Sequence, residues 1–107
     1  MADDVLLNKA AIIERCLRRV EEEYRGHEGE LDSDLTRQDS IVLNLQRACE
    51  AAIDLAMHVV RARKLGLPQE SREAFSLLNQ AGLLDETRMR KMQAMVGFRN
   101  VAVHAYQ

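Results

Sequence analysis

Residues 41–60 read IVLNLQRACEAAIDLAMHVV, and their apolar positions decide the fold class. The apolar side chains recur at steps of three and four residues: Ile41, Leu45, Ala48, Cys49, Ala52, Ile53, Ala56, Val59 and Val60. This is the period of an α-helix that buries one face, so the stretch predicts a long helix at the centre of the protein.

Both ends of this helix carry residues typical of helix boundaries. Thr36 is the predicted N-cap, with Asp39 three residues later as an acidic variant of the capping box. At the other end we expect the helix to run to about Leu65, because Gly66 is suited to the C-terminal capping position and Pro68 cannot continue the helix.

Three further helices are predicted around it, and no stretch predicts a strand. The helices run from Asp3 or Asp4 to about Tyr24, from Ser71 as N-cap to Gly82, and from Asp85 or Thr87 into the last residues. The acidic, glycine-containing stretch 26–34 indicates a loop. We therefore expect an all-α protein, an antiparallel helical bundle of about four helices, with residues 1–107 as one domain.

Composition bounds the class of protein. Hydrophobic residues make up 47% of the chain and charged residues 30%, which is typical of a soluble globular domain. No apolar stretch approaches the roughly 20 residues that span a bilayer, and the start does not resemble a signal peptide, so we expect a cytoplasmic protein with no membrane partner. Cys16 and Cys49 fall on apolar helical stripes, which favours two buried reduced thiols.

Charge is unevenly distributed along the chain. The net charge of −2 argues against a protein that coats nucleic acid by bulk electrostatics. Residues 86–107 nevertheless carry four basic residues, Arg88, Arg90, Lys91 and Arg99, against one acidic residue, Glu86. This local excess suits a small patch that contacts phosphate, although a short basic helix face has the same composition.

The most informative motif lies in this basic segment, where residues 99–107 read RNVAVHAYQ. Arg99 is a permanent forked cation suited to phosphate, and His104 is the side chain best placed to move a proton near neutral pH. On a straight helix, side chains five residues apart point about 140° away from each other. Either Gly97 loosens the helix, or two chains meet across a two-fold axis and share one site. Asn100 lies one turn from His104 and could orient its ring.

The spacing Arg-x4-His-x-Tyr, with Asn directly after Arg, resembles the signature of the HEPN superfamily of ribonucleases, and more narrowly the HepT toxins of toxin–antitoxin pairs. Residues 43–58 and 91–106 also resemble the family's second helix and motif helix. The resemblance implies a homodimeric RNA endonuclease with Arg99 and His104 as catalytic residues, and the spacing of Asn100 from His104 makes Asn100 a candidate supporting residue. It implies no metal and no cofactor. Members of the family generally continue into a further helix, so we expect this C-terminal helix to be missing here.

The same resemblance implies a protein partner. HepT toxins are encoded with a minimal nucleotidyltransferase antitoxin, MNT, which transfers AMP to the tyrosine of the motif. That residue is Tyr106 in this chain. Anionic AMP beside Arg99 would compete with RNA for the same cation, so Tyr106 is expected to serve as the off-switch.

A polar stripe on the central helix is the second candidate feature: Arg47, Glu50, Asp54 and His58. A solvated or ion-paired face is the commonest meaning of such a stripe. We expect Glu50 and Asp54 to line the dimer cleft and to orient Arg99 or His104. Two alternatives remain open. One is a metal-dependent hydrolase that uses Glu50, Asp54 and His58. The other is a non-catalytic module that binds nucleotide or phosphate, or serves as a scaffold for a partner nucleotidyltransferase.

Overall fold

The computed structural model describes residues 2–105, with side chains from residue 4 onward. Its elements in chain order are α1 (Ala2–Tyr24), a 3-10 turn η1 (Glu28–Glu30), α2 (Leu35–Ala62), α3 (Ser71–Gln80) and α4 (Glu86–Ala105). Within this range every regular element is helical, so the predicted all-α bundle of four helices is confirmed. None of these helices is long and apolar enough to cross a membrane.

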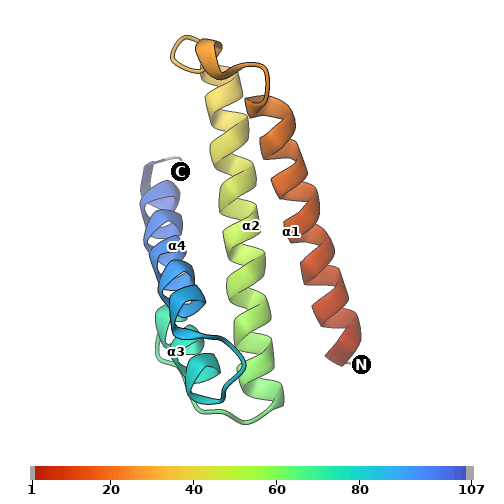
Figure 1. Cartoon of the computed structure of the whole chain (residues 1–107), viewed down its shortest axis with the longest axis vertical. Helices are drawn as coiled ribbons and strands as arrows, with labels where there is room; N and C mark the ends of the chain where they lie inside the picture. Colours follow the sequence, from red (N-terminus) through yellow and green to blue (C-terminus); the bar gives the residue numbers. More distant parts are fainter. Residues whose placement is uncertain (1, 106–107) are drawn as a thin grey trace.

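The long helix α2 is the centre of the bundle and packs against each of the other three helices. Figure 1 shows α1 running antiparallel along one side of α2, while α4 lies on the opposite side. The short helix α3 sits against the C-terminal part of α2 and leads into α4. This arrangement places the end of α4, which carries the motif, beside the middle of α2.

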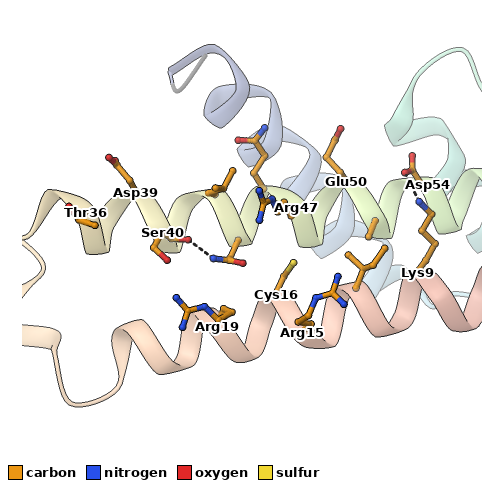
Figure 2. A pocket seen from close by; sticks show the side chains of 15 residues that line it. Lys9, Arg15, Cys16, Arg19, Thr36, Asp39, Ser40, Arg47, Glu50 and Asp54 are labelled. Carbon is orange, nitrogen blue, oxygen red and sulfur yellow. Dashed lines mark hydrogen bonds and ion pairs between the residues drawn. The ribbon is translucent and has the colours of Figure 1, made fainter.

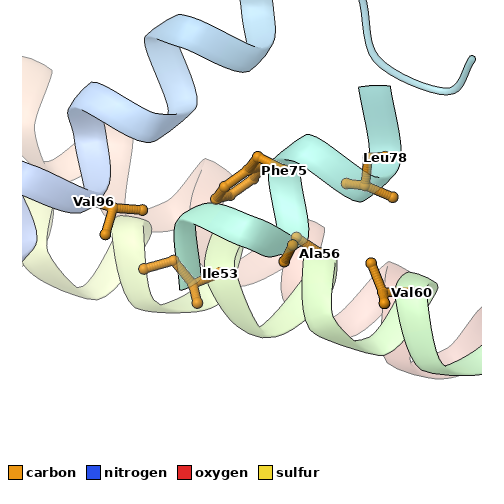
Figure 3. Close-up of a cluster of buried hydrophobic side chains, with 7 residues drawn as sticks. Ile53, Ala56, Val60, Phe75, Leu78 and Val96 are labelled. Atoms are coloured by element: carbon orange, nitrogen blue, oxygen red, sulfur yellow. The ribbon is translucent and has the colours of Figure 1, made fainter. Parts of the chain in front are cut away.

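The core lies where α2, α3 and α4 meet (Figure 3). It consists of Ile53, Ala56 and Val60 from α2, Ala74, Phe75 and Leu78 from α3, and Val96 from α4. Met57, Met89, Met92 and Met95 pack against this cluster, as flexible fillers of irregular space. Burial of the Phe75 ring alone contributes about 1.5–3 kcal/mol, so it is a principal anchor of α3 on α2.

The two ends of α2 differ from the sequence prediction. Asp34, not Thr36, is the N-cap: its backbone is extended, and its carboxylate accepts a hydrogen bond from the Arg37 backbone N–H at 2.9 Å. Thr36 lies inside the first turn. At the C-terminus, Lys64, not Gly66, takes the left-handed conformation that ends the helix, with φ of 54°. Gly66 instead lies against α3, because a Cβ there would be 3.0 Å from the Leu77 side chain.

The boundaries of α3 and α4 match the prediction in part. Gly82 ends α3 with φ of 78°, as predicted. Ser71 is the first helical residue and not the N-cap, which is Glu70, so the Ser71 hydroxyl is free for another contact. Asp85 opens α4, since its carboxylate accepts from the Arg88 backbone N–H at 2.8 Å.

Both cysteines are buried and carry free thiols, as predicted from their positions on apolar stripes. Cys16 is on α1 and Cys49 is on α2.

Candidate active site

The motif lies on the last two turns of α4, which runs without interruption from Glu86 to Ala105. The expectation that Gly97 loosens the helix is therefore wrong: Gly97 lies inside the continuous helix. Arg99 and His104 consequently point about 140° away from each other. Tyr106, the predicted site of adenylylation, lies outside the described residues.

The Arg99 side chain is held by contacts from three helices. One terminal nitrogen, Nη1, donates to the Glu50 carboxylate on α2, and the other, Nη2, lies 3.4 Å from the Ser71 hydroxyl on α3. The Nε–H donates to Asn100 Oδ1 at 2.9 Å. The side chain is only 19% exposed. The cation is therefore fixed in position before any ligand arrives.

A small pocket opens beside this fixed cation. Its volume is about 190 Å³, and it is lined by Glu70, Ser71 and Arg72 of the α3 end and by Val96, Arg99 and Asn100 of α4. A guanidinium has five N–H donors, and the contacts above use three of them. Two donors of Arg99 remain for an anionic oxygen in this pocket.

His104 is exposed on a different side of α4, and its ring makes no hydrogen bond with any residue in the described range. The predicted bond from Asn100 to His104 does not form here, because the Asn100 carbonyl oxygen accepts from Arg99 instead. The imidazole is therefore accessible to a ligand, but Arg99 of the same chain points away from it and cannot contact the same phosphate.

The side chains of the polar stripe on α2 have different surroundings and do not form one site. Glu50 contacts Arg99, as expected, whereas the Asp54 carboxylate lies 3.2 Å from the Lys9 ammonium of α1. Asp54 therefore does not orient Arg99 within this chain. The His58 Nε2 atom is buried without a hydrogen-bond partner. No three His, Cys, Asp or Glu side chains in residues 4–105 converge as metal ligands would, so the metal-site alternative built on Glu50, Asp54 and His58 has no geometric support.

A second, larger groove of about 820 Å³ runs between α1 and α2 (Figure 2). It is lined by residues of both charges, among them Lys9, Arg15, Arg19, Arg47, Asp39, Glu50 and Asp54. Glu50 borders this groove and also pairs with Arg99. Because the charges are mixed, the groove has no evident preference for an anionic ligand.

Cys49 is a buried thiol of α2 that lies within the electrostatic influence of Arg99. Burial raises the pKa of the Cys49 thiol, and the nearby Arg99 guanidinium opposes that rise without cancelling it. The thiol is therefore protonated at neutral pH and is a poor nucleophile. Cys49 is thus a buried thiol that contributes no reactive group to the site.

The sequence does not identify Ser71 and Arg72 as site residues. Ser71 is typical only of a helix start, and Arg72 is one of many arginines in the chain. Both reach the Arg99 pocket because α3 packs against α4, and no local pattern in the sequence specifies that contact.

Comparison with known proteins finds similar proteins that are described as ribonucleases. The mRNA nuclease HepT of Shewanella oneidensis is 47% identical over 105 residues, which cover 98% of this chain and 78% of the relative. A toxin–antitoxin complex with AMP-PNP contains a chain of the same fold, with a TM-score of 0.90 and 46% identity over 94% of this chain and 76% of that one.

A second solved structure has the same fold and carries a modification. It is the tri-AMPylated HEPN toxin of Shewanella oneidensis in complex with the MNT antitoxin, with a TM-score of 0.90 and 46% identity over 97% of this chain and 77% of that one. The model of the family described as "Ribonuclease HepT-like" matches residues 13–107. With the motif, the helical bundle and this match in agreement, the chain belongs to the ribonuclease HepT-like family.

Proposed function

We propose that this protein is the toxin of a toxin–antitoxin pair and that it cuts RNA in the cytoplasm without a metal ion. The observation that carries the proposal is the fixed Arg99 guanidinium. It lines a small pocket and has two N–H donors that no residue in the described range uses. His104, on the same helix, provides an unengaged imidazole. The similarity to an mRNA nuclease supports RNA as the substrate class.

The proposed reaction is an internal transfer within RNA. His104 accepts the proton of a 2′-hydroxyl, whose oxygen attacks the adjacent phosphorus as the bond to the 5′-oxygen breaks. A protonated imidazole then supplies a proton to that leaving oxygen. Arg99 stabilises the additional negative charge on the phosphoryl oxygens. The products are a 2′,3′-cyclic phosphate and a 5′-hydroxyl, and DNA is not cut because it lacks the nucleophile.

A composite site in a homodimer reconciles this chemistry with the geometry. Since Arg99 and His104 point away from each other on one unbroken helix, the phosphate bound by Arg99 of one protomer meets His104 of its partner. The outer face of α4 suits such contact, because Phe98 is 37% exposed and Val101 is 68% exposed one turn apart. A second copy of the chain would cover these side chains and bring the two motifs together.

Control by a nucleotidyltransferase antitoxin is the second part of the proposal. A related toxin is AMPylated and bound to an MNT antitoxin. The resemblance of the motif to that of HepT toxins implies Tyr106 as the acceptor of AMP in this chain. AMP on this tyrosine would add negative charge that competes with the RNA phosphate for Arg99. We expect a Tyr106→Phe protein to keep its nuclease activity and to escape modification.

The direct test is cleavage by the purified chain produced without its partner. We expect cleavage of single-stranded RNA in the presence of EDTA, with 2′,3′-cyclic phosphate ends detected by mass spectrometry of the fragments. Binding of RNA without any turnover would instead identify the chain as a non-catalytic phosphate-binding module. Cleavage that EDTA abolishes would overturn the metal-free mechanism.

A further inference from the structure

We propose that Arg72 is a second phosphate-binding cation of the Arg99 pocket and that it positions the RNA backbone for cleavage. This inference rests on the proposed ribonuclease function. Arg72 lies on the first turn of α3, 27 residues before Arg99, and lines the same pocket as Arg99 and Asn100.

The Arg72 guanidinium is oriented by α4. Its Nε–H donates to the Gln93 backbone carbonyl at 3.2 Å. The Gln93 side chain in turn donates to the Arg72 carbonyl at 3.1 Å and to the Ser76 hydroxyl at 2.9 Å. This exchange fixes the direction of the Arg72 side chain and leaves its two terminal nitrogens available for a ligand.

Gly97 provides the space for this position. A Cβ atom at Gly97 would lie 3.0 Å from Arg72 Nη2, which is tighter than an ordinary van der Waals contact. The absence of a side chain therefore lets the guanidinium lie directly against α4, next to the residues that form the pocket. This gives Gly97 a role in placing a cation, in place of the helix break expected from the sequence.

The Arg72 guanidinium has no ion-pair partner within the described part of the chain. Arg88 and Arg90 on α4 each pair with a carboxylate in their own turn, Asp85 and Glu86, whereas Arg72 makes no ion pair within residues 4–105. Glu70 also lines the pocket but forms no ion pair with Arg72. An RNA phosphate is the anion that would satisfy the free terminal nitrogens of Arg72 and the two unused N–H donors of Arg99 together.

The roles of the two arginines should differ. Arg99 stabilises charge that develops in the transition state, whereas Arg72 holds the backbone in the ground state and the transition state alike. Loss of Arg72 should therefore raise KM with little change in kcat. Arg72 is in this sense a positioning residue of the site.

The test measures RNA binding in a His104→Ala background, so that cleavage does not interfere. We compare Arg72→Gln with Arg63→Gln, which removes an equal charge from an exposed residue with no ion pair in the described range. Arg72→Gln should weaken binding of a single-stranded oligonucleotide about tenfold. It should also reduce the slope of log K against log salt by about 0.7, while Arg63→Gln changes neither quantity. Arg72→Lys should recover part of the affinity, since it retains the charge without the fork.

The outcomes separate this inference from the proposed function. If the parent protein cuts RNA and Arg72→Gln binds with unchanged affinity and salt slope, the role of Arg72 is refuted and the nuclease proposal stands. If RNA binds through Arg72 but the parent protein never cuts it, the nuclease proposal fails instead. A protein that binds no RNA at all contradicts both. Thermal melting of each variant verifies the fold, which the Gln93 bond to the backbone of residue 72 should preserve.

Discussion

Arg99 on α4 donates to the Glu50 carboxylate on α2, a residue 49 positions earlier in the chain. The contact joins the motif helix to the central helix at the point where the motif begins. It holds the guanidinium in one orientation, with one edge on Glu50 and another toward the pocket. The cation of the site is thus preorganised, which removes part of the ordering cost of binding a phosphate.

Substitution of Glu50 tests this preorganisation. Glu50→Gln should lower kcat/KM about 10- to 100-fold, because the guanidinium loses the charged partner that fixes it. The Glu50 side chain is 49% exposed, so the free energy of unfolding should change by less than about 1 kcal/mol. Glu86→Gln, which breaks an exposed ion pair with Arg90, is the matched control and should leave activity unchanged. Equal activity in the two variants would show that Arg99 needs no support from α2.

The second test is a substitution of Phe75, which anchors α3 on α2. Phe75 is 3% exposed, and Phe75→Ala should reduce the free energy of unfolding by about 3–5 kcal/mol, measured by urea denaturation. Leu67→Ala is the control, because Leu67 is 88% exposed and its loss should cost less than about 0.5 kcal/mol. A small effect at Phe75 would mean that α3 is not anchored through this core.

Gly97→Ala should separate stability from binding. Alanine in a helix interior is favoured over glycine by about 0.5–1 kcal/mol, and the Nη2 end of Arg72 near the new Cβ can shift because only its Nε is hydrogen-bonded to Gln93. The free energy of unfolding should therefore rise. RNA affinity should fall, because the guanidinium of Arg72 is displaced from the pocket. A variant that gains stability with unchanged affinity would argue against the close approach of Arg72 to α4.

The raised pKa of the Cys49 thiol predicts a loss of stability at alkaline pH. The thiol in the unfolded chain ionises at its ordinary pKa, whereas the folded thiol stays protonated to higher pH because burial raises its pKa. The unfolded state is then favoured as pH rises above the unfolded pKa, so this contribution to stability is present below that pH and is lost above it. Urea denaturation from pH 7 to 10 should show a smaller alkaline decline in Cys49→Ala. An identical decline would contradict the assignment.

The fold followed from the sequence where periodicity alone determines it. Ile53, Ala56 and Val60 lie on the predicted buried face of α2, and all three are in the core. The sequence does not distinguish Asp34 from Thr36 as the N-cap, because both are short polar side chains near the helix start and only the extended backbone at Asp34 separates them.

The site could be predicted only in part. The sequence predicts Glu50 beside Arg99, and the two side chains are in contact, but Asp54, one turn further along α2, pairs with Lys9 on α1. Four residues turn a helix direction by about 40°, which is enough to move a side chain from one neighbouring helix toward another. The approach of Arg72 to Gly97 depends on how α3 packs against α4, and no local sequence pattern predicts contacts between residues so far apart in the chain.

The most direct measurement is complementation between two inactive chains. Arg99→Ala and His104→Ala proteins carrying different affinity tags are produced together, and the mixed dimer is purified by both tags. Each variant alone should lose activity about 100-fold or more. The mixed dimer contains one composite site with both Arg99 and His104, so it should recover about half of the wild-type rate if each dimer has two such sites. A mixed dimer as inactive as its parents would contradict a site shared between two protomers.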